Sequence, residues 1–281
     1  MLKTALQGQL EYIEVSNSVS EAKIALQGAH IFHFKVKGKK PLLWLSDTAL
    51  FKTGKAIRGG IPICWPWFGA HNSNKLLPNH GFARTFLWEH IETKSISEAE
   101  TKVRLRLKSS EDSLSLWPYR FELTLDISLG TELRLSLITK NLDTQAFSIT
   151  NALHSYLRVQ DINQTYIKGL NNKPYYNKVD NSFNNIQAGK LRFTQEVDRV
   201  YQDINTPLQI QDGHDIITVK TEGSETVVIW NPAEALSSKM ADLSDYQTML
   251  CVESANALED APTIQANESH CLTTVLSHEE L

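Results

Sequence analysis

Hydrophobic and polar positions alternate along several stretches of this chain. Between residues 120 and 129 every second side chain is apolar, and residues 103–108 and 133–137 follow the same period. Successive side chains of a β-strand point to opposite faces, so this pattern is typical of antiparallel strands with one buried and one solvated face. A turn at Leu129-Gly130-Thr131 separates two of these strands.

Apolar spacing typical of amphipathic helices is weak throughout, and no low-complexity linker, charge block or fixed repeat divides the chain. A chain of 281 residues is long enough to bury a sizeable core. We therefore predict one all-β domain over residues 1–281, a large sandwich of two antiparallel sheets.

The composition of the chain gives no support for nucleic acid or a membrane as a binding partner. A formal net charge of -4 gives no electrostatic reason to expect nucleic acid or an acidic membrane as partner. Residues 1–8 lack the apolar core of a secretory signal, and no apolar run approaches the roughly 20 residues that span a bilayer. Cys64, Cys251 and Cys271 have no metal-binding spacing, so we expect buried, reduced thiols in a cytoplasmic protein.

Two irregular segments concentrate glycine, proline and aromatic residues around candidate binding side chains. Residues 57–69 contain Arg58, and residues 77–84 contain His80 and Arg84. Glycine allows backbone angles that other residues avoid, and proline cannot donate a ladder hydrogen bond. These segments therefore predict shaped loops pressed against a core; a buried connection without function is the alternative.

A third segment, residues 149–159, predicts a strand with two different faces. One face would be aliphatic and pack on the core, and the other would turn a polar surface to a cleft or to solvent. The aliphatic face consists of Leu153, Leu157 and Val159, and the polar face of His154, Tyr156 and Arg158. An ordinary half-exposed strand is the competing interpretation.

Glu253 is a single acid within an otherwise apolar strand, residues 248–255. Burying an unpaired charge is costly, so this carboxyl group must be paired, hydrogen-bonded or protonated. It therefore has either a structural partner or a chemical task.

Taken together these segments resemble the glucose-6-phosphate 1-epimerase (hexose-6-phosphate mutarotase) family of the aldose 1-epimerase superfamily. The resemblance spans about residues 20 to 275 in order. The matching runs are Arg58–Gly69, Pro78–Arg84, Trp117–Phe121, Leu153–Val159, Glu196–Tyr201, Trp230–Pro232 and Cys251–Glu253. It implies an antiparallel β-sandwich of the galactose-mutarotase-like type.

The resemblance also implies an isomerase that opens a cyclic aldose at C1–O5 and closes it on the other face. Glu253 would be the general base that takes the proton of the C1 hydroxyl, and His154 the general acid that protonates the ring oxygen. Neither a metal nor an organic cofactor is required, since no hydride moves. A neighbouring acid could raise the pKa of His154 and so extend activity to neutral pH.

Binding of the substrate is implied for a further set of side chains. Arg58 and Arg84 would hold the 6-phosphate, because a guanidinium group meets phosphate oxygens with two parallel hydrogen bonds. Asn79 would add a hydrogen bond, and His80 would contact a sugar hydroxyl or brace its loop. Asp198 would hold Arg199 or an active-site residue in place.

Three details stay open. Trp65 and Trp67 are either stacking faces for a pyranose or core residues. A substrate contact near Asn177 or Lys178 stays unassigned, because residues 171–195 match the family poorly. The glycines beside Arg58 and Arg84 fit close approach of a ligand, although both arginines could instead close their loops through carbonyl oxygens.

Two other functions compete with a hexose-6-phosphate mutarotase that acts, as a monomer, on a small sugar phosphate. One is an aldose 1-epimerase for neutral sugars, which would gain nothing from two converging guanidinium groups. The other is a non-catalytic carbohydrate-binding protein, which has no need of both an acid and a base.

Overall fold

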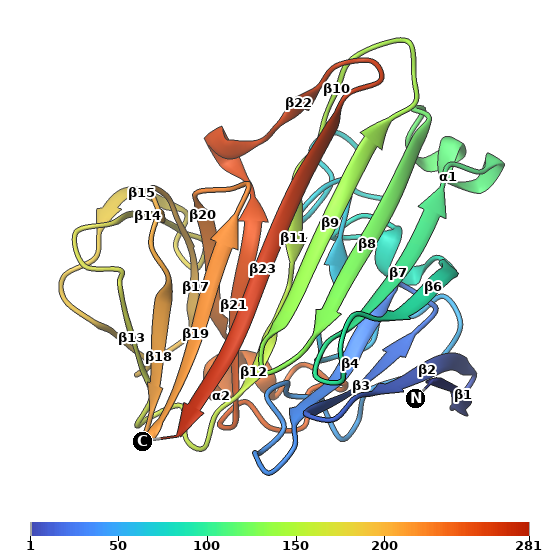
Figure 1. Ribbon diagram of the computed structural model, residues 1–281. Coiled ribbons are helices and arrows are strands. Elements are labelled where there is room, and N and C mark those ends of the chain that lie inside the picture. The colour runs from blue at the N-terminus through green and yellow to red at the C-terminus, as the bar shows by residue number, and fades with distance from the viewer. Residues whose placement is uncertain (1, 281) are drawn as a thin grey trace.

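Two large antiparallel β-sheets stacked face to face dominate the computed structural model, which describes residues 2–280 (Figure 1). One sheet has nine strands in the order β16 (Leu191–Arg192), β13 (Tyr166–Lys168), β18 (Leu208–Asp212), β19 (Asp215–Glu222), β23 (Ser269–Glu280), β9 (Leu133–Asn141), β8 (Phe121–Leu129), β7 (Thr101–Lys108) and β6 (Glu89–Ser95). The other has eight strands in the order β15 (Ser182–Ile186), β14 (Pro174–Asn177), β17 (Val197–Tyr201), β20 (Thr226–Asn231), β21 (Met249–Asn256), β11 (Asn151–Leu153) and β5 (Ile63–Cys64), with β12 (Tyr156–Arg158) also paired to β21.

Smaller elements surround the sandwich. An N-terminal sheet lies at one side of it and runs β1 (Leu2–Gln7), β2 (Leu10–Ser16), β3 (Ser20–Ala25) and β4 (His30–Val36) (Figure 1). A short ribbon pairs β10 (Phe147–Ser148) with β22 (Thr263–Ile264). The helices are short: α1 (Glu111–Leu116), α2 (Ala233–Ser237), and the 3-10 turns η1 (Ala83–Thr85) and η2 (Leu258–Asp260). Within residues 2–280 none of them has the length and apolar character needed to cross a membrane.

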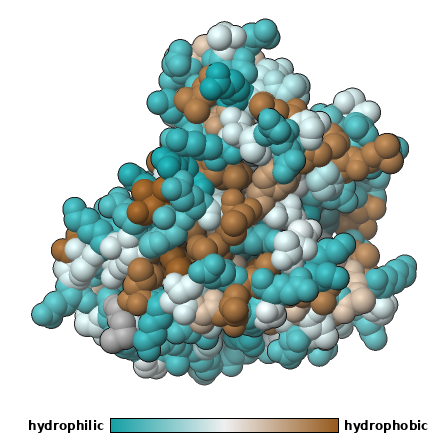
Figure 2. Space-filling view, turned by 90° about the vertical axis from the view of Figure 1, so that its right-hand side faces the viewer, coloured by the Kyte–Doolittle hydropathy of each residue, from teal (hydrophilic) through white to brown (hydrophobic). Residues whose placement is uncertain are grey.

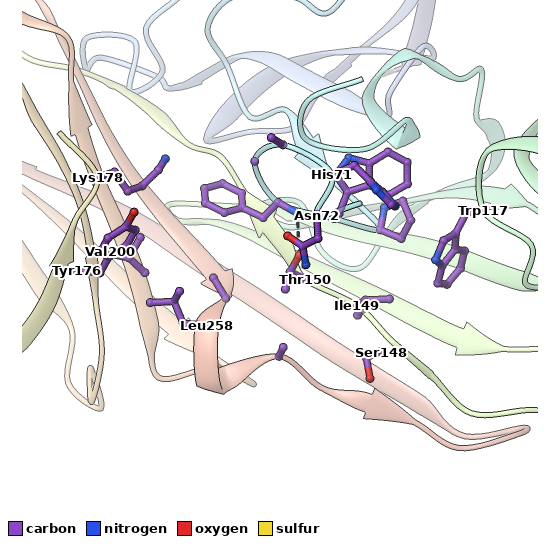
Figure 3. A pocket seen from close by; sticks show the side chains of 17 residues that line it. His71, Asn72, Trp117, Ser148, Ile149, Thr150, Tyr176, Lys178, Val200 and Leu258 are labelled. Atoms are coloured by element: carbon purple, nitrogen blue, oxygen red, sulfur yellow. Dashed lines mark hydrogen bonds between the residues drawn. The ribbon is translucent and has the colours of Figure 1, made fainter. Parts of the chain in front are cut away.

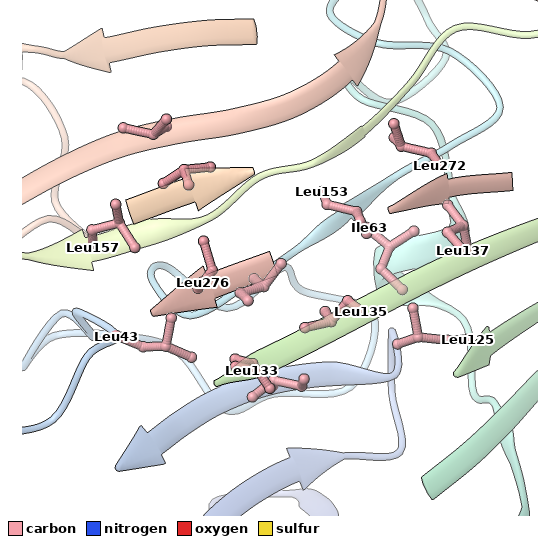
Figure 4. Close-up of a cluster of buried hydrophobic side chains, with 14 of the residues drawn as sticks. Leu43, Ile63, Leu125, Leu133, Leu135, Leu137, Leu153, Leu157, Leu272 and Leu276 are labelled. Carbon is pink, nitrogen blue, oxygen red and sulfur yellow. The ribbon is translucent and has the colours of Figure 1, made fainter. Parts of the chain in front are cut away.

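The period-two pattern decides which side chains form the core. In β8 the alternate apolar residues from Phe121 to Leu129 are buried, and the polar residues between them are partly exposed. Inward side chains of the nine-stranded sheet, such as Leu125 and Leu276, meet Leu153 and Ile63 of the eight-stranded sheet (Figure 4). The predicted sandwich of two antiparallel sheets is therefore confirmed, as are the strands predicted around residues 103–108, 120–129 and 133–137.

The side chains at the alternate positions of each strand point away from this core. In β21, Leu250 and Val252 pack inside the sandwich, whereas Cys251 and Glu253 face the outer side of the eight-stranded sheet. Figure 2 views the side of the molecule that lies at the right in Figure 1, where hydrophilic side chains cover most of the surface and hydrophobic ones form a band across its middle. The candidate site lies on the outer face of the eight-stranded sheet. Glu253 faces it because of its position in the alternation along β21.

One prediction about the thiols is wrong. Cys64 and Cys251 are buried, but Cys271 is exposed on β23. Leu272 and Leu276, with opposite parity on the same strand, are the residues that face the core. Cys271 therefore points outward from the nine-stranded sheet.

Candidate functional site

A cavity of about 300 Å³ on the outer face of the eight-stranded sheet brings the predicted site residues together. They are Arg58, Asn79, His80, Arg84, His154, Asp198 and Glu253. Its remaining wall consists of Tyr156, from the predicted polar face, and of four residues to which the sequence assigned no role: Phe68, Lys178, Trp230 and Met240. Segments far apart in the chain thus converge on one concave site.

Strand register places His154 directly across from Glu253. Leu153 pairs with Ser254, and Tyr156 pairs with Cys251, so the residues between them face each other. The single strand predicted over residues 149–159 is instead two strands, β11 and β12. The pairing with β21 is interrupted after Leu153, where the Ser155 N–H donates to Leu153 O at 2.9 Å. The His154 N–H continues the pairing with β5 by donating to Pro62 O at 3.0 Å.

The two side chains form a buried pair. His154 Nε2 lies 3.3 Å from Glu253 Oε1, and only 8% of His154 and 1% of Glu253 is exposed. His154 Nδ1 and Glu253 Oε2 are buried without a hydrogen-bond partner within the described chain. No third protein group therefore fixes where a proton on this pair resides.

Burial moves the pKa values of the pair in opposite directions. It raises the pKa of Glu253 well above its usual value, since a desolvated carboxylate is unfavourable. The pKa of His154 is lowered well below its usual value by burial, and further by His80, Arg84 and Arg58. The expected rise from a neighbouring acid is therefore wrong: desolvation, His80 and two guanidinium groups lower the pKa of His154.

Tyr156 links His154 to Arg58. Its ring stacks on the His154 ring with a centroid separation of 4.8 Å and an interplanar angle of 8°. Its hydroxyl oxygen accepts a hydrogen bond of 2.9 Å from Arg58 Nη1. The same guanidinium donates through Nε and Nη2 to both carboxylate oxygens of Asp242, at 3.2 and 3.3 Å. Arg58 is thus held in one orientation by a phenol and a carboxylate.

Arg158, which the sequence pattern put on the same face as Tyr156, lies elsewhere. It is exposed, at the far end of β12, and lines a separate cavity with Lys40 and Asp215. The polar face predicted for residues 149–159 therefore contributes only two of its three members to the site.

The 3-10 turn η1 supplies the second arginine. Arg84 Nη2 donates to the carbonyl oxygen of Asn79 at 2.7 Å and forms no ion pair with any carboxylate of residues 2–280. Asn79 therefore contributes its backbone to the position of Arg84. An arginine that lines a cavity without an acidic partner is a binding position for an anion.

His80, in the segment that precedes η1, is held by hydrogen bonds to the backbone of Gly69. Its φ of 66° lies in the left-handed region, its N–H donates to Gly69 O at 2.7 Å, and its Nδ1 accepts from Gly69 N at 3.3 Å. Burial lowers the pKa of His80 to about 3, with Arg84 and Lys178 adding to the shift. The neutral ring therefore carries its proton on Nε2, where it can donate to a sugar hydroxyl.

Gly81 lets this loop approach the core. A Cβ at this position would lie 1.9 Å from the carbonyl oxygen of Trp65, and the φ of Gly81 is 68°. We expect Gly81→Ala to displace the loop and to reduce both the melting temperature and the anomerisation rate. Gly189→Ala is the matched control, because its φ of 64° is similar and its Cβ would meet nothing within 4 Å. Equal effects of the two substitutions in thermal melts would mean that backbone strain, and not close approach, is responsible.

Asp198 pairs with a lysine that the sequence pattern did not resolve. Its Oδ2 lies 3.0 Å from Lys178 Nζ, and its Oδ1 is buried without a hydrogen-bond partner in residues 2–280. Lys178 Nζ also lies 5.5 Å from the centre of the Phe68 ring. Arg199 does not bond to Asp198; it donates to Gln187 and to Tyr201 on the other face of the sheet.

The aromatic residues of the cavity differ from those considered in the sequence. Trp65 is completely buried in the core, and Trp67 donates from its indole N–H to Pro78 O at 2.8 Å. Phe68 and Trp230 line the cavity in their place. Parity could have indicated Trp230, which precedes the Asn-Pro turn at the end of β20 and faces outward there.

A larger cavity of about 700 Å³ adjoins the site, and the two share Phe68 and Lys178 (Figure 3). Its walls include Tyr176, Leu258 and Trp117, and it lacks the His154–Glu253 pair. The buried His–Glu pair therefore belongs to the smaller cavity.

Three side chains of types that can ligate a metal lie together at one place within residues 2–280. His154, Cys251 and Glu253 offer ligand atoms that all lie within 4.8 Å of one another. This group includes the acid–base pair, so a bound ion would occupy the atoms needed for proton transfer.

The sequence and the fold both have close counterparts. The aldose 1-epimerase family pattern matches residues 11–277. A protein of Escherichia coli (strain K12) named "Putative glucose-6-phosphate 1-epimerase" is 35% identical over 274 residues, covering 95% of this chain and 90% of that protein. A protein of Cenchrus ciliaris with the same name is 36% identical over 261 residues, covering 88% and 78%.

Solved structures agree with these sequence relatives. The crystal structure described as "a putative mutarotase (YeaD) from Salmonella typhimurium" superposes with a TM-score of 0.92 at 33% identity, covering 100% of this chain and 94% of that one. A galactose mutarotase-like protein from Lactobacillus casei has a TM-score of 0.76 at 15% identity, covering 95% and 100%, and shares the fold. With the family pattern over nearly its whole length and relatives above 30% identity, the chain belongs to the aldose 1-epimerase family.

Proposed function

We propose that this protein is a hexose-6-phosphate mutarotase that interconverts the α and β anomers of glucose 6-phosphate. The observation that carries the proposal is a buried acid–base pair in the same cavity as an arginine without an acidic partner. His154 and Glu253 supply proton transfer, and Arg84 together with Arg58 supplies a binding position for a phosphate. The names of the relatives from Escherichia coli and Cenchrus ciliaris support the same substrate.

In this proposal ring opening needs one proton to leave the substrate and one to arrive. Glu253 takes the proton of the C1 hydroxyl while the C1–O5 bond breaks, and His154 gives its proton to O5. The open-chain aldehyde then rotates about C1–C2, and closure reverses both transfers on the other face. A positioned proton-transfer group contributes about 10²–10⁴ in rate.

NMR exchange spectroscopy between the two anomers, with and without the protein, tests the activity. We expect exchange of glucose 6-phosphate to be accelerated far more than exchange of glucose. Equal acceleration of both sugars would favour the neutral aldose 1-epimerase. Binding without acceleration would favour a non-catalytic carbohydrate-binding protein.

The pH dependence follows from the opposite pKa shifts of the pair. The pKa of Glu253 is raised and that of His154 is lowered, so the pair holds one shared proton between a lower and an upper pH limit. This singly protonated pair is the active form. Activity falls as pH rises through the upper limit, because that proton is lost, and falls below the lower limit, because the base is lost. We expect a bell-shaped kcat/KM profile whose alkaline limb lies well above the ordinary Glu value of about 4.3. An alkaline limb near that ordinary value would contradict the effect of burial.

The reaction is expected to run without a metal ion. Treatment with EDTA followed by dialysis should leave the anomerisation rate of glucose 6-phosphate unchanged. A rate lost on treatment and restored by Zn²⁺ would instead assign His154, Cys251 and Glu253 to a functional metal site.

A further inference from the structure

The buried pair offers little stabilisation for charge: 1% of Glu253 and 8% of His154 is exposed, and Oε2 and Nδ1 have no hydrogen-bond partner in residues 2–280. Burial favours a protonated, neutral Glu253 and an unprotonated His154. Ring opening needs the reverse arrangement, a carboxylate on Glu253 and an imidazolium on His154. The required form is therefore a minor tautomer of the singly protonated pair, and something must favour it when substrate is bound.

The protein's own charges are divided between the two partners. On the His154 side lie Arg58, joined to the stacked Tyr156, and the neutral His80. On the Glu253 side lie Lys178 and its partner Asp198, with buried Cys251 on the same strand face. Arg84 contributes to the pKa shifts of both groups. Arg58 reaches the His154 side through Tyr156, whose hydroxyl it bonds and whose ring stacks on the imidazole.

The carboxylates of the site neutralise only part of the positive charge of its arginines and lysine. Asp242 engages Arg58 on its outer edge, through Nε and Nη2, and Asp198 engages Lys178. Arg84 has no carboxylate partner within the described chain. Three of the five N–H bonds of Arg58 are used by Tyr156 and Asp242, which leaves donors for an incoming phosphate.

We propose that the 6-phosphate of the substrate is an activating group as well as a handle: by offsetting the charge of Arg58 it transfers the shared proton from Glu253 to His154. This inference rests on the proposed function. The step conserves protons, because the hydrogen leaves the Glu253 carboxyl and adds to the His154 imidazole. Nothing else must enter the site, and the resulting pair is poised for ring opening.

The proximity of the two groups makes this transfer sensitive to a distant charge. His154 Nε2 and Glu253 Oε1 are 3.3 Å apart, and their other polar atoms lack partners in residues 2–280. Opposite charges within a few ångströms shift a pKa by about 1–3 units, and one unit corresponds to a tenfold ratio of the two forms. We expect bound phosphate to raise the imidazolium fraction of His154 by about tenfold or more.

The ¹⁵N NMR spectrum of histidine-labelled protein tests the inference directly. The probe is 1,5-anhydroglucitol 6-phosphate, which cannot mutarotate because it lacks the anomeric hydroxyl, and unphosphorylated 1,5-anhydroglucitol is its control. Loss of the signal in His154→Gln identifies the His154 resonances. We expect the phosphorylated analogue alone to give the imidazolium signature, with both ring nitrogens resonating alike. The same signature with both analogues, or with neither, overturns the inference.

Two charge-removing variants of the same cavity should respond in opposite ways. Arg58→Gln removes the cation on the His154 side, so the imidazolium fraction should rise even without phosphate. Lys178→Gln removes the cation on the Glu253 side, so the proton should stay more firmly on Glu253. Equal responses of the two variants would mean that total charge, and not its division, governs the pair.

A substrate supplied in two pieces tests the consequence for rate. D-xylose is glucose without its sixth carbon, and inorganic phosphite dianion supplies the missing charge. After the phosphite-catalysed rate without protein is subtracted, phosphite should accelerate enzymatic anomerisation of xylose about tenfold or more. No acceleration, in a protein that acts on glucose 6-phosphate, overturns the inference and leaves the proposed function standing. A protein inactive on glucose 6-phosphate itself refutes the proposed function first.

Discussion

Glu253→Gln and His154→Ala should each lower the kcat for anomerisation of glucose 6-phosphate by a factor of about 10²–10⁴. Each side chain supplies half of a proton exchange that needs both. The pair is joined by a 3.3 Å contact in one cavity. The other imidazole there, His80, is bonded to Gly69, and the other carboxylate, Asp198, is paired with Lys178. NMR exchange spectroscopy between the anomers measures the loss.

The double variant sharpens this expectation. An acid without its base cannot complete ring opening, so the double variant should be scarcely slower than either single one. His90→Ala, on β6 and outside the cavity, is the control for loss of a partly buried histidine. Near wild-type rates in Glu253→Gln would remove the carboxylate from the mechanism.

Replacing Arg84 by Ala should weaken binding of glucose 6-phosphate about ten- to a hundred-fold while preserving activity on glucose. A hydrogen bond to a charged group contributes about 1.5–3 kcal/mol, which gives that range. Arg58→Ala should weaken binding of the phosphorylated sugar by a similar factor. Titration with the non-reacting analogue 1,5-anhydroglucitol 6-phosphate measures both losses.

A matched control separates the two arginines from a general effect of charge. Arg104 forms an exposed ion pair with Asp126 on the nine-stranded sheet, far along the chain from either loop. Arg104→Ala changes the net charge equally and should leave binding unchanged. Equal losses in Arg84→Ala and Arg104→Ala would exclude a local phosphate contact, as would a crystal soak that places sulfate away from both cavity arginines.

Period-two alternation was sufficient to predict the sandwich and which residues face its core, because one face of each long strand is buried and the other is exposed to solvent. The same rule, applied to residues 269–276, would have placed Cys271 on the outer face, opposite to Leu272. The interruption between β11 and β12 was not predictable in this way, since there the Ser155 N–H donates locally to Leu153 O instead of to β21.

The candidate site was predictable where residues sit in irregular, aromatic-rich motifs, and not where a partner is remote. Asp242 holds Arg58 across 184 positions of sequence, and no local pattern marks it. Lys178 follows the short strand β14, in a stretch of mixed polarity without clear alternation. The pKa directions also required the structure, because burial decides them and the sequence shows only which charges are available.

The register that sets His154 opposite Glu253 assigns chemistry and selectivity to different parts of the fold. The reacting pair belongs to neighbouring segments tied by main-chain hydrogen bonds, so its spacing is as fixed as the sheet itself. Arg58 and Arg84 lie instead outside the strands of both sheets, in the loop before β5 and in the turn η1. Exchanging those loops could therefore retarget the protein to differently substituted aldoses while the proton-transfer distance stays the same.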